Sequence, residues 1–368
     1  MSASADTTTT KRAGVPVYKR RRRRRIYGGT GVAVVLVAAL VVWAVTRGGG
    51  SGTAALPGFT ISNSQGNVAS SDSIIESQPS LAKTIPAHLH FVPFDAGVTA
   101  IAEMRSGSVQ AISGVGNPPV TEAIGAGTAV DIVMAASFDA DALIVPPSIT
   151  SPGQLAGKSV GVLVGSSEDY ELRGWLGLRH LTGSVKVVGF ESEQAVAAAY
   201  LAGAVAAAYV YAGPEAELTA KGGHPIINAE QIARLGIPGI GVIAVARSVV
   251  QQDSALVQAY VCAEVTGTRL MTGPKADTYL AQSAGVQGVP ASLILPATKS
   301  YPFIPLSQEL YWLGSTPHDQ GSRIVRAYQL TGQFLVGQGR LSAVPSAAQI
   351  AAHIDISFIK KALSGGCP

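Results

Sequence analysis

Short segments rich in valine, isoleucine and alanine alternate with helical segments along most of this chain, beginning at residue 59. The apolar segments include "FTISN" (59–63), "VDIVMAASF" (130–138) and "GIGVIAVARS" (239–248), and helical stretches such as "GVTAIAEMRSG" (97–107) lie between them. Each apolar segment has the length and composition of a buried strand. This alternation is typical of a doubly wound α/β protein, in which helices cover a buried sheet.

The composition is consistent with such a protein. Of the 368 residues, 47% are hydrophobic and 14% are charged, which argues against a disordered chain. The net charge of +4 is unevenly divided, because residues 1–47 hold ten Lys and Arg residues and a single acid. The other 321 residues keep 17 of the 27 basic groups and 22 of the 23 acids, a net charge of −5. We therefore expect no nucleic acid as a partner of the folded part.

An uncharged stretch of 21 residues, 26–46, directly follows the basic run at 19–25. Such a stretch is long enough to cross a hydrocarbon core of about 30 Å, and basic residues before it keep its N-terminus in the cytoplasm. It is longer than the apolar part of an ordinary secretory signal, and no convincing cleavage site follows. We expect a cytoplasmic tail (1–25), an uncleaved single-pass membrane anchor (26–46) and a Gly/Ser linker (47–58), with the folded domain on the extracytoplasmic side.

The chain has two cysteines, Cys262 and Cys367. Cys262 falls on the apolar side of a helix and is most simply a buried small hydrophobe, but a disulfide between the two is an open alternative in an oxidising compartment. The sequence contains no phosphate-binding loop, serine-hydrolase elbow, zinc-protease motif or CxxC pair. His88 and His90 share a strand face without another His or Cys nearby, so we expect no metal and no cofactor.

The stretch "GVLVGSSEDYEL" (161–172) predicts a buried strand, a turn and the start of a helix. Ser167 could cap this helix, and Glu168 and Asp169 suit its first turn because the helix dipole favours negative charge there. The same helix N-terminus could also bind the anionic head of a ligand. The residues leave both interpretations open, with the side chains of Glu168 and Asp169 expected to point away from a ligand.

Several segments occur in one order along residues 88–363: "FVPFDAG", "MRSGSVQAISGVGNPP", "DALIV", "SPGQLAGKSVGVLVGSSEDYEL", "AAAYLAGAVAAAYVYAGPE" and "TGQFLVGQGRL". Together they resemble the taurine/alkanesulfonate/nitrate class of ABC-transporter substrate-binding proteins, most closely the taurine-binding type. The resemblance implies a two-lobed type II periplasmic-binding-protein fold with two crossing segments, near 139–145 and 239–247. Lobe 1 would comprise 59–140 and, with the C-terminal helices, 244–368; lobe 2 would comprise 141–243.

The resemblance also implies a ligand site between the lobes. Two helix N-termini facing each other would hold a sulfonate or carboxylate, and Tyr170 and Tyr211 would line its apolar part. Asp95 or Asp141 could pair with a ligand amine. The predicted ligand-binding residues are Asn63, Asp95, Gly97, Gly116, Asn117, Pro118, Asp141, Ser166, Ser167, Tyr170 and Tyr211.

The predicted function is therefore that of a membrane-anchored extracytoplasmic solute-binding protein, expected to be a monomer. It would close its lobes around a small organic anion or zwitterion and deliver it to the permease subunits of an ABC importer, without making or breaking a bond. Two alternatives stay open: a cleft enzyme of the same fold, of the menaquinone-pathway type, and a sensor or scaffold domain that has lost transport. Gly241, which stands where the class has an acid, keeps the sensor alternative open.

Overall fold

The computed structural model describes residues 56–367 except 65–66, 68, 293–294 and 296–300. The expected basic tail and membrane anchor, and the linker up to residue 55, lie outside the described residues. Over the part that is described, none of the helices combines the length and the apolar character that crossing a membrane requires.

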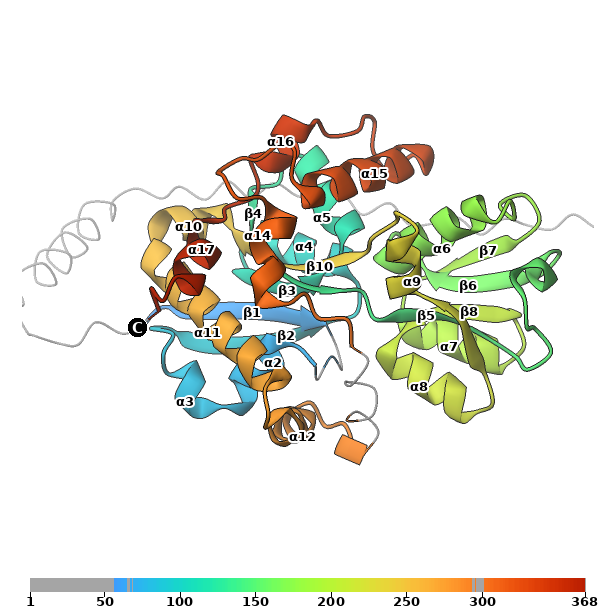
Figure 1. Ribbon diagram of the computed structural model, residues 1–368, viewed down its shortest axis with the longest axis horizontal. Helices are drawn as coiled ribbons and strands as arrows, with labels where there is room; N and C mark the ends of the chain where they lie inside the picture. Colours follow the sequence, from blue (N-terminus) through green and yellow to red (C-terminus); the bar gives the residue numbers. More distant parts are fainter. Residues whose placement is uncertain (1–55, 65–66, 68, 293–294, 296–300, 368) are drawn as a thin grey trace, which may run out of the picture. The chain divides into compact units, whose positions relative to one another are not determined.

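Two five-stranded sheets form the frame of the described chain (Figure 1). The first sheet has the strand order β2-β1-β3-β10-β4. Strand β1 runs parallel to β2 and β3, and β10 runs antiparallel to β3 and β4. The strands of this sheet are β1 (Gly58–Ser64), β2 (His88–Phe94), β3 (Ala111–Val115), β4 (Val130–Phe138) and β10 (Ile240–Ala246).

The second sheet has the strand order β7-β6-β8-β5-β9. Strand β6 runs parallel to β7 and β8, whereas β5 runs antiparallel to β8 and β9. Each sheet therefore has parallel strands and one antiparallel strand, which is β10 in the first sheet and β5 in the second. The strands of this sheet are β5 (Asp141–Val145), β6 (Ser159–Leu163), β7 (Lys186–Phe190), β8 (Ala207–Tyr211) and β9 (His224–Asn228).

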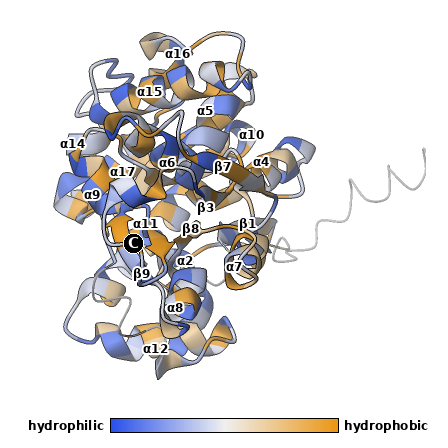
Figure 2. Ribbon diagram, turned by 90° about the vertical axis from the view of Figure 1, so that its right-hand side faces the viewer, coloured by the Kyte–Doolittle hydropathy of each residue, from blue (hydrophilic) through white to orange (hydrophobic). Residues whose placement is uncertain are grey.

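Amphipathic helices cover both sheets. Helices such as α12 and α15 alternate between hydrophobic and hydrophilic residues along their length (Figure 2). The second sheet is covered by α6 (Ser167–Leu178), α7 (Glu193–Leu201), α8 (Ala212–Ala220) and α9 (Ala229–Arg234), with a 3₁₀ turn at Pro152–Leu155. Around the first sheet lie α2 (Ser71–Ser77), α3 (Pro79–Ala82), α4 (Gly97–Ser106), α5 (Asn117–Gly125), α10 (Arg247–Gln252), α11 (Ser254–Thr272), α12 (Ala276–Val286), α14 (Glu309–Leu313), α15 (Arg323–Gly337), α16 (Ala347–Ala351) and α17 (Ser357–Leu363), with a 3₁₀ turn at Leu306–Gln308.

Separate hydrophobic cores stabilise the two sheets. One large cluster joins the first sheet to its helices and contains the fully buried Phe59 and Tyr260. The second sheet has a cluster around Trp175 and Tyr209 on one face and a smaller one around Val196 and Val210 on the other. Because each sheet buries its own apolar surface, the two halves form distinct lobes, as the family resemblance implies.

Two segments connect the lobes (Figure 1). The first, residues 139–140, leads from β4 to β5, and the second, residues 229–239, leads from β9 to β10. They touch where the Asp139 N–H donates to the carbonyl of Gly239 at 3.2 Å. The predicted boundary at 243/244 falls inside β10, which pairs with β4 from Ile240 onward and is buried throughout. Residues 240–243 therefore lie in the first sheet and not in lobe 2, because an apolar strand pairs along its whole length.

The two cysteines form a disulfide bond. Cys262 lies on α11 and Cys367 follows α17, with 5.5 Å between their Cα atoms. Cys262 is also buried, at 5% exposed. The bond ties the C-terminal segment to the core of lobe 1, which corrects the simpler expectation of an unpaired, buried Cys262.

Candidate functional site

A pocket lies between the two lobes, where the parallel strands of both sheets end. Its wall includes Ser64 and Phe94 at the ends of β1 and β2, and Leu163 and Tyr211 at the ends of β6 and β8. The cavity has a volume of about 120 Å³. Ligands of open α/β sheets bind outside the carboxyl ends of the strands, so the topology makes this pocket the candidate ligand site.

Seven of the predicted ligand-binding residues line this pocket. They come from the segments that follow β2 and β3, from the first residue of β5, from the start of α6 and from the end of β8. The segments that the sequence predicts to meet at one site thus do so in the structure. These residues are Asp95, Gly97, Gly116, Asp141, Ser166, Ser167 and Tyr211.

The other four predicted residues do not line the pocket. Asn63 is buried in β1 and borders a separate surface hollow. Pro118 is buried in the first turn of α5. Tyr170 packs edge-on against Phe334 of α15, with 5.6 Å between the ring centroids. None of these three residues is part of the cavity lining.

Asn117, the fourth of these residues, holds the second crossing segment in place. Its Oδ1 accepts from the backbone N–H of Ile240 at 2.8 Å, and its Nδ2 donates to the carbonyl of Pro238 at 2.8 Å. Nδ2 also lies 3.3 Å from Oγ1 of Thr331 on α15. The side chain is fully buried with its donors and acceptor engaged, so it joins elements of the fold and has no group left for a ligand.

The start of α6 differs from the prediction by one residue. Ser166, not Ser167, is the N-cap, and its Oγ accepts from the Asp169 N–H at 3.3 Å. Asp169 turns away from the pocket, as expected, and binds Arg173 at 2.5 Å. Glu168 does not turn away: it is 7% exposed and lines the pocket beside Ser167. Successive helix residues point about 100° apart, so Glu168 and Asp169 point in different directions.

Further acids line the pocket that the sequence analysis did not select. Asp139 lies in the first crossing segment, and Glu193 is the first residue of α7. One signal could have identified Glu193: "SEQ" (192–194) repeats the pattern of a serine cap followed by an acid, directly after a strand of the same sheet. With Asp95, Asp141 and Glu168, five acids line the cavity, and none of its lining residues is Lys, Arg or His.

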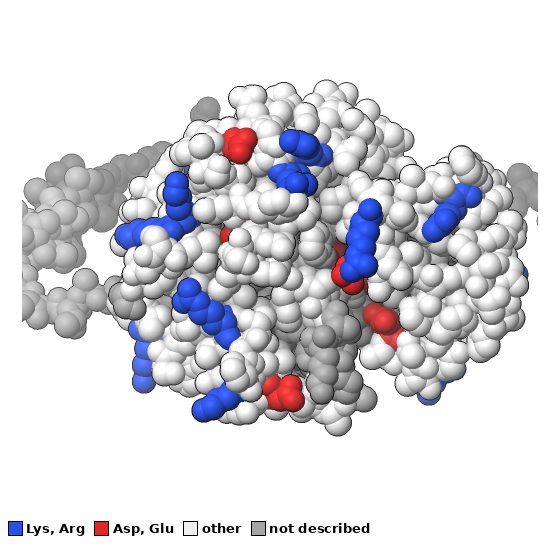
Figure 3. All heavy atoms as spheres, in the orientation of Figure 1, with Lys and Arg blue, Asp and Glu red and all other residues white. Residues whose placement is uncertain are grey.

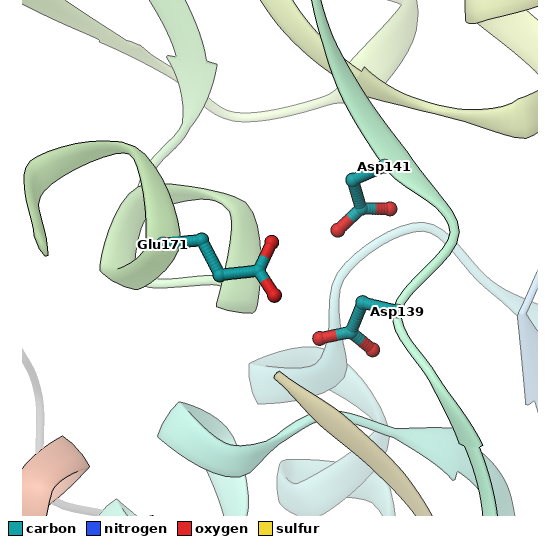
Figure 4. Close-up of side chains that lie close together, drawn as sticks. All are labelled: Asp139, Asp141 and Glu171. Atoms are coloured by element: carbon teal, nitrogen blue, oxygen red, sulfur yellow. The ribbon is translucent and has the colours of Figure 1, made fainter. Parts of the chain in front are cut away.

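Three carboxyl groups meet at one end of this site (Figure 4). Asp139 and Asp141 flank the first crossing, and Glu171 extends toward them from α6. One oxygen of each lies within 4.8 Å of the others. Two hydrogen bonds hold the Glu171 carboxyl group in place: it accepts from the hydroxyl of Tyr209 at 2.7 Å and from the Gly239 N–H at 3.1 Å. A Cβ at Gly239 would lie 2.1 Å from Oδ2 of Asp139, so only glycine permits this approach.

Burial and mutual repulsion keep these acids protonated at higher pH than usual. Burial, followed by the charge of Glu168, raises the pKa of Asp139 to about 7 and that of Glu193 to about 9. The same two causes raise the pKa of Asp141 well above its ordinary value. Burial, followed by the charge of Asp139, does the same for Glu171. The ligand-free site therefore holds protons near neutral pH.

One face of the molecule shows how the charged side chains outside the pocket are distributed (Figure 3). On the face drawn in Figure 3, Lys and Arg side chains are scattered and do not form one basic patch. Two arginines near the start of α6 are paired: Arg173 with Asp169, and Arg340 with Glu122 at 2.8 Å. The guanidinium of Arg340 packs against Gly165, where a Cβ would overlap it, so this residue of lobe 1 contacts lobe 2 directly.

Comparison with known proteins relates the chain to binding proteins. No family model matches it. It is 25% identical over 285 residues to the Taurine-binding periplasmic protein of Escherichia coli (strain K12), a match that covers 74% of this chain and 84% of that protein. Among solved structures, the alkanesulfonate-binding protein SsuA from Xanthomonas axonopodis pv. citri bound to MOPS has a TM-score of 0.67 at 20% identity, covering 83% of this chain and all of that one.

The predicted resemblance to the taurine/alkanesulfonate/nitrate class is confirmed in sequence, and the two-sheet α/β fold matches that of periplasmic binding proteins. The fold also occurs in an enzyme: desulfurization enzyme DSZB has a TM-score of 0.56 at 19% identity, covering 84% of this chain and 99% of that one. The fold alone therefore does not separate binding from catalysis. The side chains that line the pocket are what can indicate whether the protein binds a solute or converts it.

Proposed function

We propose that this chain is the extracytoplasmic solute-binding component of an ABC importer, which closes its two lobes around a small solute and delivers it to the permease subunits. The observation that carries this proposal is the pocket at the carboxyl ends of both sheets, in a chain whose curated relative is a periplasmic binding protein. Each lobe has its own core, and two segments connect them, so one lobe can move relative to the other as binding requires.

The names of the relatives refer to taurine and alkanesulfonates. Of the two kinds of solute that the resemblance implies, an organic anion or a zwitterion, the pocket favours the zwitterion, because its acids need a positive group. We assign the ammonium end to Asp141 and its neighbours. The other end would lie near Gly116, Ser166 and Ser167, with the Tyr211 ring as a wall.

We further propose that residues 26–46 anchor the protein in the membrane, with the folded domain outside and acting as a monomer. In this proposal lobe 1 comprises 59–140 together with the chain from 240 onward, and lobe 2 comprises 141–239. The Cys262–Cys367 disulfide supports an extracytoplasmic location, since such bonds persist mainly in oxidising compartments.

Solute binding is expected to stabilise the purified protein. A solute present at about 100 times its dissociation constant adds roughly 2.7 kcal/mol to the free energy of unfolding, which a thermal-shift assay with taurine, alkanesulfonates and amino acids would detect. The variants Ser167→Ala and Tyr211→Ala should weaken the shift, because both side chains line the pocket. Recovery of a chemically altered solute would favour the enzyme alternative. If no charged organic solute shifts the melting temperature, the proposal is wrong.

A further inference from the structure

The negative charge of the pocket is not offset by any basic side chain that lines it. Five acids line the cavity without a Lys, Arg or His among the lining residues. The arginines nearby are already committed, Arg173 to Asp169 and Arg340 to Glu122. Three of the five, Asp141, Glu168 and Glu193, are buried, and carboxylates gathered at low exposure repel one another and lose hydration, so their charged form is unfavourable without a positive partner. Within the described residues, that partner would have to come from solution.

Three of these acids, Asp139, Asp141 and Glu193, each carry an oxygen that no donor satisfies. Asp141 is 4% exposed and Glu193 is 1% exposed, yet Oδ2 of Asp141 and Oε1 of Glu193 have no hydrogen-bond partner. The second oxygen of Glu193 accepts from the Tyr211 N–H at 3.4 Å, which fixes the orientation of the carboxylate. Buried polar groups in native proteins are nearly always paired, so unpaired oxygens in a pocket indicate that a ligand supplies donors.

We propose that this pocket recognises a small organic cation, an alkylammonium or a diamine, whose N–H groups donate to Asp141 and Glu193. Its charge lies among the acids that both lobes contribute, Asp95 from lobe 1 and Glu168 from lobe 2. The inference rests on the proposed solute-binding function and narrows the class of ligand. The site selects the positive group of the ligand, and the ligand needs no sulfonate.

A sulfonate alone fits this pocket poorly. The N-terminus of α6 is the natural place for its oxygens, but the Ser166 side chain already caps this helix. Glu168 and Asp169 already place negative charge in its first turn. Glu168 also lines the cavity. A sulfonate at this position that carries no ammonium group of its own would meet like charge on several sides and no basic side chain among the residues that line the cavity.

The structure also favours an organic cation over a metal ion. Asp139, Asp141 and Glu171 could in principle hold a metal (Figure 4). Both oxygens of Glu171 already accept hydrogen bonds, from Tyr209 and Gly239, and Glu171 does not line the cavity. The remaining acids are spread over both lobes instead of converging on one point, as the six or more oxygens of a hard divalent cation would.

The walls between the acids suit an organic molecule. Phe94, Leu163, Tyr211 and Tyr301 line the cavity along with the carboxyl groups. Aromatic faces attract ammonium groups, and apolar side chains bury a hydrocarbon chain. This combination of carboxylates and rings suits an ammonium group attached to a short alkyl body.

The test measures binding to the purified full-length protein at about pH 8, by calorimetry and by thermal shift. The probes are n-butylamine, butane-1,4-diamine, taurine, butane-1-sulfonate, Mg²⁺ and Zn²⁺. We expect the diamine to bind most tightly and butane-1-sulfonate not to bind. Asp141→Asn and Glu193→Gln should each weaken diamine binding by at least about tenfold, because each removes a carboxyl group that gives up its proton and becomes a charged acceptor when the cation binds.

The control variant is Asp277→Asn, which removes one exposed carboxylate on α12, far from the pocket lining. It should leave diamine binding unchanged, which would show that the pocket variants do not act merely by changing the net charge of the protein. Both pocket variants keep the size of the side chain and relieve repulsion, so they should fold.

Three results would overturn the inference. If taurine or butane-1-sulfonate binds and the amines do not, the protein is still a solute-binding protein but its site is not a cation site. If a divalent metal ion alone stabilises the protein, the cation is inorganic. If no organic probe binds, the proposed function fails together with this inference.

Discussion

Raising the pH from about 5 to about 8 is expected to lower the free energy of unfolding of the ligand-free protein by several kcal/mol. The cause is the group of buried acids in the pocket, whose protonated forms the folded state favours. Asp139, with a pKa of about 7 in the folded protein, accounts for roughly 3 kcal/mol by itself, at about 1.4 kcal/mol for each tenfold change in acidity. Denaturant unfolding at a series of pH values would measure the effect.

The sign follows from proton binding in the two states. An acid whose pKa is raised on folding binds more protons in the folded protein, so its stabilising contribution is complete below about pH 4 and is lost as the pH rises through its folded pKa. Glu193, with a pKa of about 9, and Glu309 in lobe 1, with a pKa of about 8, act in the same direction. His353 acts in the opposite direction, because burial lowers its pKa, but it is a single group.

Two variants separate the contribution of the pocket acids to the pH dependence of stability from that of the rest of the protein. Asp139→Asn and Glu193→Gln should flatten the dependence of stability on pH and make the protein more stable at about pH 8, since each removes a carboxylate that lacks a counter-ion. The exposed Asp277→Asn should reproduce the dependence of the unaltered protein. Stability that is constant or increases between pH 5 and pH 8 would contradict the assignment of raised pKa values.

Removing the disulfide is expected to cost about 3 kcal/mol. The bond closes a loop between positions 105 residues apart, and cross-links of this kind contribute typically 2–4 kcal/mol by restricting the unfolded chain. It also holds the last residues of the chain against α11, in the core of lobe 1. Urea unfolding with and without a reductant measures this cost.

Single variants separate the stability that the disulfide bond contributes from the stability that the packing of the Cys262 side chain contributes. Cys367→Ala removes the bond but leaves Cys262 in the core, whereas Cys262→Ala also removes buried volume and should destabilise the protein further. Reduction should shift the unfolding midpoint as much as Cys367→Ala does. If reduction leaves the midpoint unchanged, or if the folded, oxidised protein reacts with a thiol reagent, the two cysteines are not bonded in solution.

Much of the fold could be predicted from the sequence because its signals are local. Runs of valine and isoleucine such as 130–138 and 240–246 predict strands, and they are buried strands in the structure. The boundary between lobe 2 and the second part of lobe 1 was harder to predict, because an uncharged apolar run has the same sequence pattern in either lobe. Pairing of Ile240 with Phe138, 102 positions earlier in the chain, decides it, and such pairing leaves no local pattern.

Part of the pocket lining could be predicted from the sequence, but its charge could not. Gly116 and Ser167 meet as expected, and a Cβ on Gly116 would lie 2.4 Å from the Ser167 hydroxyl oxygen. The orientation of Glu168 and the role of Asn117 could not be deduced, because they depend on where a helix begins and on which segment passes beside it. Asp139 was missed for a related reason: a single acid in a two-residue connection has no pattern of its own.

The central claim is that the pocket holds buried carboxyl groups whose charge only a positive solute offsets. Carbon-13 NMR of the side-chain carboxyl groups, titrated on the ligand-free protein, tests it most directly, with Asp139→Asn and Glu193→Gln assigning the two signals. We predict midpoints near pH 7 for Asp139 and near pH 9 for Glu193, both moving to lower pH when butane-1,4-diamine is added. Midpoints below about pH 5 for both groups in the ligand-free protein would contradict the claim.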